Sequence, residues 1–466
     1  MFAKIQQVHF VGIGGIGMSG IAEVLLNLGY KVSGSDLKGS VVTQRLKGLG
    51  ATVFEGHLAE NISGAEVVVT SSAISQENPE VVEAHKLHVP VIQRAEMLAE
   101  LMRLKYGIAI AGMHGKTTTT SMVAAVLAAG GLDPTVVVGG RVDAMGSNAR
   151  LGKSQYLVAE ADESDRSFLK LSPILSVVTN IDREHMDCYR NMRDVKKTFL
   201  EFMDRVPFYG MLVVCNDDPM VRRLLPQAQR RTVTYGTKRG SDFLIKLEDR
   251  PSGFSGEGQP LSCFRVSYRK KDLGEFTLHV PGVHNILNAT AAIAVGVGLD
   301  VGVEAIRTGL DQFRGVDRRF QLRGRAAGAS VIDDYGHHPT EIRATLAAAK
   351  QCGFRKVHVV FQPHRYTRTR DLMEEFTAAF GDADSLFVLD IYAASEKPIE
   401  GISGEALARM ICEKGGRHAA YVGSFGDAVT SVVAAARDGD MILTLGAGSV
   451  SQLGPMILEK LKERPM

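Results

Sequence analysis

The residues with the clearest capacity for chemistry lie in the stretch Ala111-Gly112-Met113-His114-Gly115-Lys116-Thr117-Thr118. It follows an apolar run ending at Ile110 and precedes a segment rich in Thr, Ala and Val. The pattern therefore predicts a strand, a glycine-rich turn and a helix. In such a turn, backbone N–H groups cradle phosphates, the lysine contacts the β- and γ-oxygens, and a threonine hydroxyl can ligate Mg²⁺. The loop is shorter than the standard P-loop, because Ile110 stands where that motif has its first glycine. The alternative is a tight turn with an incidental lysine.

A second glycine loop, Gly12-Ile13-Gly14-Gly15-Ile16-Gly17, follows the predicted strand 8–11. It fits the G-x-G-x-x-G pattern, and Asp36 follows the next strand, where a ribose-binding acid belongs. The pattern indicates a phosphorylated ligand on a helix N-terminus and does not identify the nucleotide. Taken alone, it is typical of a dinucleotide dehydrogenase, and the alternative is a loop that only packs helix on strand.

An acidic run follows the predicted strand 156–159, with four acids between Glu160 and Asp165. Their mutual repulsion would be relieved by a divalent cation, so Glu160 and Thr117 are candidates to share one Mg²⁺ with a phosphate. A solvated acidic loop is the alternative. His185 follows the predicted strand 175–179, and there it is a candidate for a second Mg²⁺.

Two asparagines open a long, Ala-rich helix predicted over 285–299. Asn285 and Asn288 can hydrogen-bond a purine edge, although a helix cap explains them equally well. Arg319, in an Arg pair near the start of the last α/β series, is a candidate phosphate clamp or a surface residue.

Two polar loops follow strands predicted in the last third of the chain. The first, 333–339, contains Asp334 and Tyr335, and such a combination is uncommon in a purely structural loop. The second, 362–370, contains His364, Arg365 and Arg368 and indicates an anion site for a carboxylate or phosphoryl group. A basic loop that faces solvent is the alternative.

Short apolar runs and helical patterns alternate along the chain in three series, which predicts an α/β protein with mostly parallel sheets. At 466 residues, about three domains are expected, and we place them at 1–104, 105–314 and 315–466. Alternating apolar residues between 242 and 280 predict a small antiparallel patch in the middle domain.

The composition excludes several classes of protein. A net charge of +2 without a basic tail gives no signal for nucleic acid or a membrane surface. There is no run long enough for a membrane span and no signal peptide. The five cysteines are scattered, which favours free thiols in a reducing compartment, so we expect a cytoplasmic protein.

The motifs together resemble the Mur ligases, the ATP-dependent amide-forming ligases of peptidoglycan synthesis. The resembling stretches span nearly the whole chain in the family's order. They are the two glycine loops, Gly34-Ser35-Asp36, Thr70-Ser71-Ser72-Ala73-Ile74, Arg94-Ala95-Glu96-Met97-Leu98, the run from Glu160 to Asp165, the run from Asp333 to Glu341, and the stretch from Gln362 to Asp371.

The resemblance implies a Rossmann-like domain for a UDP sugar, a central P-loop ATPase domain, and a Rossmann-like C-terminal domain for the amino acid. It is closest to the members that add L-alanine. It implies that ATP phosphorylates the lactyl carboxylate of UDP-N-acetylmuramate, and that the amine of L-alanine attacks the acyl phosphate. The partners are then UDP-N-acetylmuramate, L-alanine, ATP and Mg²⁺, and we expect a monomer or homodimer.

The resemblance also implies roles for individual residues. Lys116, His185 and Arg365 are the implied catalytic residues. The implied ATP-binding residues are Gly112, Met113, His114, Gly115, Lys116, Thr117, Thr118, Asn285, Asn288, Arg319 and Asp334. The implied UDP-sugar site is Gly14, Gly15, Ile16, Gly17, Asp36, Ser71, Ser72 and Arg94. Tyr335, His364, Arg365 and Arg368 are implied for the amino acid, and Thr117, Glu160 and His185 for metal.

Three other functions remain as alternatives. The first is a recycling ligase that attaches a preformed tripeptide to the same UDP sugar. The second is an NAD-dependent oxidoreductase built on the first glycine loop, which would leave Lys116, Thr117 and Glu160 without a role. The third is a regulatory ATPase whose turnover is indifferent to amino acids.

Overall fold

The computed structural model describes residues 5–71, 73–142, 147–247, 253–254, 260–415 and 419–464. Of the predicted site residues, Ser72 lies outside the described residues, and so does the side chain of Ile16. All five cysteines are described, and they are free thiols as predicted. Within the described part of the chain, no helix is both long and apolar enough to cross a bilayer.

The chain folds into two compact units, each built from more than one stretch of sequence. The first unit contains Met1–Leu247, Arg265–Phe276 and Leu287–Phe313. The second contains Glu248–Phe264, Thr277–Ile286 and Arg314–Met466. The chain therefore passes from one unit to the other several times between Leu247 and Arg314.

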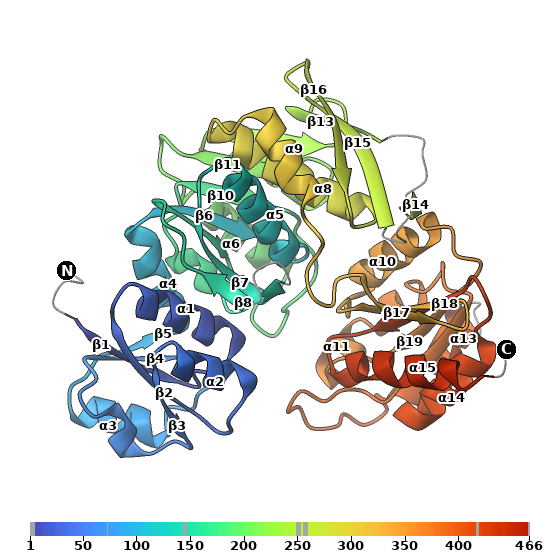
Figure 1. Cartoon of the computed structure of the whole chain (residues 1–466), viewed down its shortest axis with the longest axis horizontal. Coiled ribbons are helices and arrows are strands. Elements are labelled where there is room, and N and C mark those ends of the chain that lie inside the picture. The colour runs from blue at the N-terminus through green and yellow to red at the C-terminus, as the bar shows by residue number, and fades with distance from the viewer. Residues whose placement is uncertain are drawn as a thin grey trace. The chain divides into compact units, whose positions relative to one another are not determined.

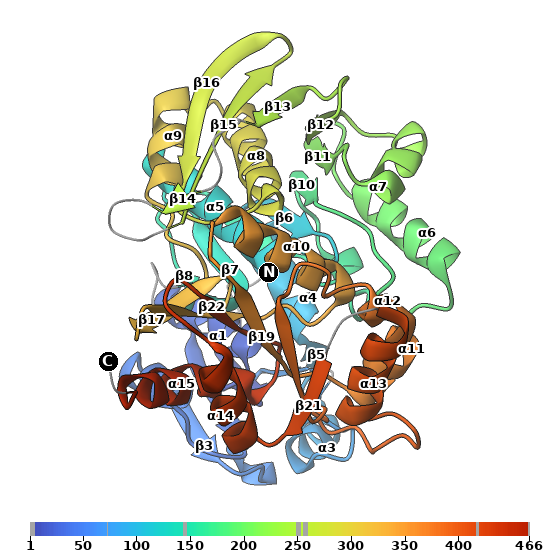
Figure 2. The same cartoon turned by 90° about the vertical axis from the view of Figure 1, so that its right-hand side faces the viewer.

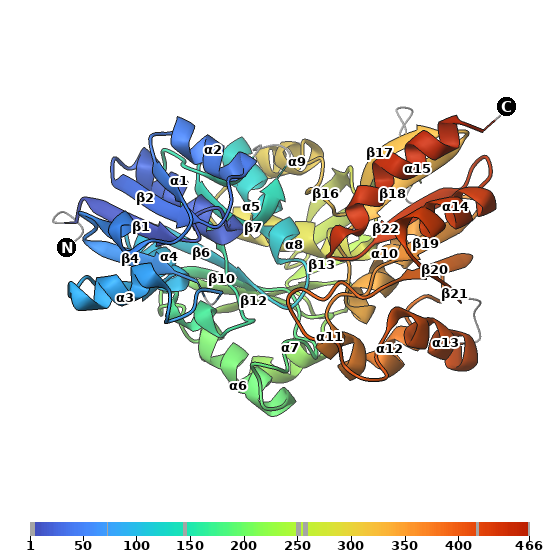
Figure 3. The same ribbon diagram turned by 90° about the horizontal axis from the view of Figure 1, so that it is seen from below.

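The N-terminal part of the first unit is a parallel five-stranded sheet in the order β3-β2-β1-β4-β5 (Figure 1). Its strands are β1 (Gln7–Val11), β2 (Lys31–Asp36), β3 (Thr52–Glu55), β4 (Val67–Thr70) and β5 (Val91–Gln93). Its helices are α1 (Ile16–Asn27), α2 (Val41–Gly48), α3 (Pro79–Lys86) and α4 (Arg94–Arg103). Figure 3 shows α1 and α2 on one side of this sheet and α3 on the other, which is a doubly wound arrangement.

The rest of the first unit is built on a larger, mostly parallel sheet. From one edge its strands run β8 (Ser147–Arg150), β7 (Thr135–Val142), β9 (Tyr156–Glu160), β6 (Tyr106–Ala111), β10 (Leu175–Val178), β11 (Met211–Cys215), β12 (Thr232–Gly236) and β13 (Phe243–Leu247). The helices are α5 (Lys116–Ala129), α6 (Met192–Met203), α7 (Pro219–Leu224), α9 (Val303–Asp311) and α8 (Val283–Gly298), which belongs to this unit from Leu287 onward. Buried runs such as Ile108–Ala111 explain the near-continuous apolar strands, because parallel sheets are covered on both faces.

The predicted antiparallel patch continues this sheet beyond β13. It consists of β14 (Gly253–Phe254), β15 (Pro260–Tyr268) and β16 (Lys271–Leu278). Strand β15 lies beside β13, and β16 pairs with β15 (Figure 2). Arg269 and Lys270 join β15 to β16, and both have positive φ, as a two-residue hairpin turn requires. Residues of this hairpin belong to both compact units.

The second unit contains a six-stranded sheet in the order β17-β18-β22-β19-β20-β21, in which only β17 is antiparallel to its neighbour. Its strands are β17 (Gln321–Ala326), β18 (Ala329–Asp334), β19 (Val357–Phe361), β20 (Ser385–Leu389), β21 (Ala419–Gly423) and β22 (Met441–Leu445). Its helices are α10 (Pro339–Gln351), α11 (Tyr366–Asp371), α12 (Met373–Thr377), α13 (Gly404–Gly415), α14 (Phe425–Ala435) and α15 (Leu453–Lys462).

The two faces of this sheet carry separate cores. Residues of α10, α12 and α13 pack on one face, and residues of α14 and α15 pack on the other (Figure 3). The last strand, β22, lies between β18 and β19. The helices α10 and α12, which follow β18 and β19, pack on one face of the sheet, whereas α15, which follows β22, packs on the other. In open α/β sheets, ligands bind at the carboxyl ends of the strands beside such a switch.

Candidate functional site

The shortened glycine-rich loop lies between β6 and α5, at the carboxyl end of a parallel strand. Gly112 has φ +134° and Gly115 has φ +83°, which are conformations that disfavour a side chain. A Cβ atom on Gly112 would lie 2.0 Å from Oγ1 of Thr179, and one on Gly115 would lie 2.7 Å from Oδ1 of Asn288. Both positions therefore require glycine, for backbone conformation and for space.

We expect Gly112→Ala to lower the free energy of unfolding by about 3 kcal/mol, because backbone strain and a steric clash add. Gly131→Ala is the matched control, since Gly131 has φ +77° and a Cβ atom there would have no neighbour within 4 Å. That variant should lose only about 1 kcal/mol. Thermal unfolding of the two variants measures the difference, and equal losses would show that the close approach to Thr179 does not matter.

Lys116, the first residue of α5, folds back over its own loop. Its Nζ atom donates to the carbonyl oxygens of Gly112 at 2.8 Å and of Met113 at 3.3 Å. It also pairs with Oε1 of Glu163 at 2.7 Å. Burial alone would lower the pKa of Lys116, but the neighbouring carboxylates, led by Glu163, raise it above its usual value. The lysine is therefore held as a cation where a phosphate would need one.

The Glu163 carboxylate contacts both Lys116 and His185. It is fully buried, and its Oε1 atom lies 3.4 Å from Nε2 of His185 as well as next to Lys116. Its Oε2 atom is also buried, and it has no hydrogen-bond partner among the described residues. A buried carboxylate oxygen in that state is suited to a cation that binds with the ligand.

His185 lies in the loop after β10, and its backbone has φ +57°, which is uncommon for a residue with a side chain. Burial alone would lower the pKa of His185, but the hydrogen bond to Glu163 and the charges of Glu184 and Glu163 raise it. His185 and Lys116 thus both contact Glu163. Their predicted catalytic roles stay predictions.

The other predicted metal ligands lie on the neighbouring strand and helix. Glu160 is the last residue of β9 and pairs in register with Ile110 of β6, directly before the glycine loop. Thr117 is half-buried in the first turn of α5. Sequence reasoning selected Glu160 from the acidic run and did not select Glu163, which the structure places against Lys116. The roles of Glu160 and Thr117 stay predictions.

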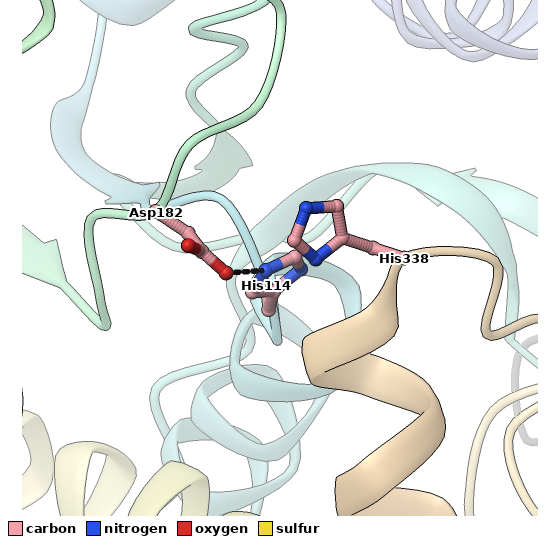
Figure 4. A group of neighbouring side chains, drawn as sticks. All are labelled: His114, Asp182 and His338. Atoms are coloured by element: carbon pink, nitrogen blue, oxygen red, sulfur yellow. Dashed lines mark hydrogen bonds and ion pairs between the residues drawn. The ribbon is translucent and has the colours of Figure 1, made fainter. Parts of the chain in front are cut away.

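His114 and Met113 face different surroundings within the loop. Nε2 of His114 forms a hydrogen bond with Asp182 at 2.9 Å (Figure 4), and its backbone N–H donates to Oδ1 of Asn180 at 2.9 Å. Met113 is buried in the hydrophobic core of the first unit. Because Met113 points into the core, its side chain has a packing role, and only its backbone remains available to a phosphate.

The predicted adenine-side asparagines lie three residues apart on the continuous helix α8. Asn288, in the first unit, lies against Gly115, close enough that its side chain would touch any Cβ atom there. Asn285, in the second unit, is buried, and its amide donates to the carbonyl oxygen of Pro281 at 2.7 Å. Their proposed contact with a purine stays a prediction.

The N-terminal glycine loop is fixed by the end of β2. The backbone N–H groups of Gly12 and Ile13 donate to the carbonyl oxygen of Ser35, and that of Gly14 donates to Oδ2 of Asp36 at 2.8 Å. The Asp36 carboxylate therefore supports the loop itself. Asp36 therefore has a structural role in this loop.

Arg94 connects this loop with the acidic run of the larger sheet. A Cβ atom on Gly17 would lie 3.0 Å from the Arg94 side chain, so the guanidinium passes directly beside the loop. Its Nη2 atom also pairs with Oδ2 of Asp162 at 3.3 Å. Ser71 is half-buried just after the end of β4. The structure thus brings Gly14, Gly17, Asp36 and Arg94 to one end of the sheet.

In the second unit, Asp334 holds together the loop that follows β18. The backbone N–H groups of Phe320 and Gly336 each donate to its carboxylate at 2.8 Å, and the Thr345 hydroxyl donates at 3.2 Å. Burial raises the pKa of Asp334. These contacts give Asp334 a structural task, while its predicted nucleotide contact stays a prediction.

Arg319 and Tyr335 pack together in the same loop region. The guanidinium of Arg319 lies 5.2 Å from the centre of the Tyr335 ring and 3.4 Å from Oε1 of Glu341. Burial alone would lower the pKa of Arg319, but Glu341 and Asp334 raise it. The cation is therefore held between an aromatic face and two carboxylates.

The loop after β19 forms a basic and aromatic cluster. The His364 ring stacks on Tyr392 with centroids 5.5 Å apart, and its Nδ1 atom accepts from Nη1 of Arg368 at 3.1 Å. Arg365 is exposed, with φ +69°. Sequence reasoning missed Tyr392, which follows β20 by three residues and carries no motif of its own. Of the predicted amino-acid-binding residues, His364 and Arg365 thus lie directly before α11 and Arg368 lies in its first turn.

Burial, with the nearby His337, Arg368 and Arg365, lowers the pKa of His364 to about 3. Because the unfolded chain binds this proton near pH 6.5, stability from the neutral form is complete above that pH and falls as the pH drops toward 3. We expect the thermal midpoint of His364→Gln to depend less on pH between 5 and 7 than that of the unmodified protein. Parallel pH profiles for the two proteins would contradict this assignment.

Three family models match successive parts of the chain. The model described as Mur ligase family, catalytic domain, matches residues 7–106. The Mur ligase middle domain matches residues 110–296, and the Mur ligase glutamate ligase domain matches residues 318–448. The chain belongs to the Mur ligase family.

Its similar proteins include ligases of one kind. The UDP-N-acetylmuramate–L-alanine ligase of Koribacter versatilis is 72% identical over 100% of this chain and 99% of that protein. The enzyme of the same name from Acidobacterium capsulatum is 63% identical with the same coverage. A crystal structure of the UDP-N-acetylmuramate–alanine ligase from Thermotoga maritima has a TM-score of 0.79 and 30% identity, covering 97% of this chain and 98% of that one.

These comparisons confirm the predicted family and the three-domain α/β class with mostly parallel sheets. The domain limits of 1–104, 105–314 and 315–466 stay predictions, as do the roles of individual site residues.

Proposed function

We propose that the protein ligates L-alanine to the lactyl carboxylate of UDP-N-acetylmuramate at the expense of ATP, in peptidoglycan precursor synthesis. The observation that carries the proposal is the cluster of Lys116, Glu163 and His185 behind a glycine loop at the carboxyl end of a parallel strand. The 72% identity to a ligase of that name over the full chain supports the choice of substrates. Five free cysteines favour a reducing compartment, so we place the protein in the cytoplasm.

The chemistry requires activation, because a carboxylate is a poor acyl donor. Lys116 stabilises the charge of the phosphoryl group as it moves from ATP to the substrate carboxylate. The amine of L-alanine then attacks the acyl phosphate, and inorganic phosphate leaves. Exclusion of water from the acyl phosphate is needed for amide formation to prevail over hydrolysis.

The residues around the lysine suit Mg²⁺, which binds oxygen ligands. Glu163, with one buried oxygen that has no partner among the described residues, and the hydroxyl of Thr117 would hold it, with Glu160 close by on β9. Bound there, Mg²⁺ would neutralise phosphate charge. A Mur ligase from Thermotoga maritima, solved in complex with ADP, has the same fold at 18% identity.

The UDP sugar is assigned to the N-terminal sheet. The loop Gly12–Gly17 offers a helix N-terminus, and Arg94 beside Gly17 supplies a positive charge for the diphosphate. The amino acid is assigned to the second unit, where exposed Arg365 can pair with its carboxylate and neutral His364 can donate from Nε2. Arg368 orients that histidine.

The decisive experiment measures ADP release from the purified protein with ATP, Mg²⁺ and UDP-N-acetylmuramate, across L-alanine, glycine, L-serine and a preformed tripeptide. We expect ADP only when the UDP sugar and L-alanine are both present, with matching formation of the amide product. Turnover with the tripeptide alone would identify a recycling ligase, and turnover without any amino acid would identify a regulatory ATPase. A nicotinamide-dependent absorbance change without ADP would support an oxidoreductase.

A further inference from the structure

Tyr189 connects the loop that carries His185 to the loop that carries Glu163. It is buried, with a relative exposure of 2%, between β10 and α6. Its backbone N–H donates to the carbonyl oxygen of His185 at 3.1 Å. Its hydroxyl donates to the carbonyl oxygen of Glu163 at 2.6 Å. One residue thus bonds to the main chain of both functional residues.

Arg166 fixes the Tyr189 ring from the other side. Its guanidinium lies 4.7 Å from the ring centre, and its Nη2 atom donates to the carbonyl oxygen of Cys188 at 3.2 Å. The same guanidinium is anchored by Asp194 of α6, with Nη2 and Oδ2 2.5 Å apart. The acidic loop and the histidine loop are therefore joined by two adjacent side chains, one contributed by each loop.

The backbone of both loops is held in uncommon conformations. Arg166 has φ +63° and His185 has φ +57°, and neither is glycine. Residues with side chains adopt this region only where surrounding contacts determine it, and such residues cluster at functional sites. Tyr189 and Arg166 donate to main-chain carbonyl oxygens of both loops, namely those of His185, Cys188 and Glu163.

We propose that Tyr189 is a positioning residue that sets the Glu163 carboxylate and the His185 imidazole at their mutual distance, for binding of Mg²⁺ and ATP. The inference rests on the proposed function of that site and adds a residue that touches neither substrate nor cation.

The test compares Tyr189→Phe with the unmodified full-length protein. The variant removes one hydroxyl and keeps the buried ring. We expect the Kd for ATP in the presence of Mg²⁺, measured by calorimetry, to rise about five- to tenfold. The Mg²⁺ concentration for half-maximal ADP release should rise similarly and saturating Mg²⁺ should restore most of the rate, while the KM for UDP-N-acetylmuramate changes less than about twofold. Unchanged ATP affinity, or equal changes in all constants, would overturn the inference.

Tyr235→Phe is the matched control, because Tyr235 is an equally buried tyrosine of the same unit, on β12. It should leave the Mg²⁺ and ATP constants unchanged, and an equal shift there would count against a specific role for Tyr189. Asp194→Asn is a second variant, which loosens Arg166 without touching the core. It should shift the Kd for ATP and the Mg²⁺ requirement in the same direction even if Tyr189→Phe does not fold. If neither constant shifts, the proposal that Tyr189 and Arg166 hold the two loops together is refuted.

The calorimetric measurement separates this inference from the proposed function. If the unmodified protein binds ATP but shows no alanine-dependent ADP release, the proposed function fails while the role of Tyr189 is still decided by the Kd ratio. If the unmodified protein ligates L-alanine and Tyr189→Phe binds ATP equally well, only the positioning role fails.

Discussion

Lys116→Ala is expected to lower the rate of alanine-dependent ADP release by about a thousandfold or more. Lys116 is the only lysine or arginine of the described glycine loop, 111–118. Its Nζ atom lies within the loop, where it donates to the carbonyl oxygens of Gly112 and Met113. UDP-sugar binding should persist, because the loop Gly12–Gly17 lies on a different sheet. Steady-state kinetics and direct titration with UDP-N-acetylmuramate measure the two effects, and an equal loss of both would contradict the assignment.

The same substitution removes the lysine partner of the buried Glu163 carboxylate, and we therefore expect a loss of stability of about 3 kcal/mol. The double variant Lys116→Ala, Glu163→Gln should recover most of that stability without recovering activity. This pattern distinguishes loss of a catalytic charge from simple unfolding. Recovery of activity in the double variant would show that Lys116 serves only to neutralise Glu163.

Glu163→Gln is expected to lower kcat/KM by about a hundredfold or more, with a higher requirement for Mg²⁺. The amide has nearly the same shape, but it carries no charge for a cation, for Lys116 or for His185. Because Glu163 raises the pKa of His185, that pKa should also fall in the variant, and histidine titration by NMR would report it. An unchanged Mg²⁺ requirement would show that Glu163 does not face the cation.

Asp165→Asn is the control for this variant, because Asp165 belongs to the same acidic run but is exposed. Its carboxylate accepts only from the backbone N–H of Ser167, at 2.9 Å, among the hydrogen bonds seen for it in the described residues. It should retain nearly full activity. Glu160→Gln separately tests the metal ligand that the sequence indicated, and a loss similar to that of Glu163→Gln would support a shared cation.

The parts of the site that are consecutive in the sequence could be predicted from it. Strand, glycine turn and helix follow one another at 106–129, so local pattern was sufficient to place Lys116. The sequence also predicts a metal site in the acidic run and favours Glu160, the residue at the end of the strand. The turn after β9 carries Glu163 to Lys116, and only the three-dimensional path of that turn could identify it.

Residues that act through packing were beyond the reach of a single sequence. Tyr189 and Tyr392 belong to no charged cluster, and their partners Glu163 and His364 are distant in sequence. The resemblance to the Mur ligases implies a nucleotide contact for Asp334, and the structure adds that its carboxylate accepts two backbone N–H groups and a hydroxyl. Buried acids at strand ends serve loops as well as ligands, and sequence does not distinguish the two.

The repeated passage of the chain between the two units has a consequence for dissecting the protein. A truncated chain that stops at Phe313 keeps two segments of the second unit, Glu248–Phe264 and Thr277–Ile286. It lacks the rest of that unit, Arg314–Met466. The complementary fragment lacks those same segments; one of them includes Val280, beside which Gly315 lies. Fragments cut near residue 314 should therefore be poorly soluble apart and should regain activity only when produced together.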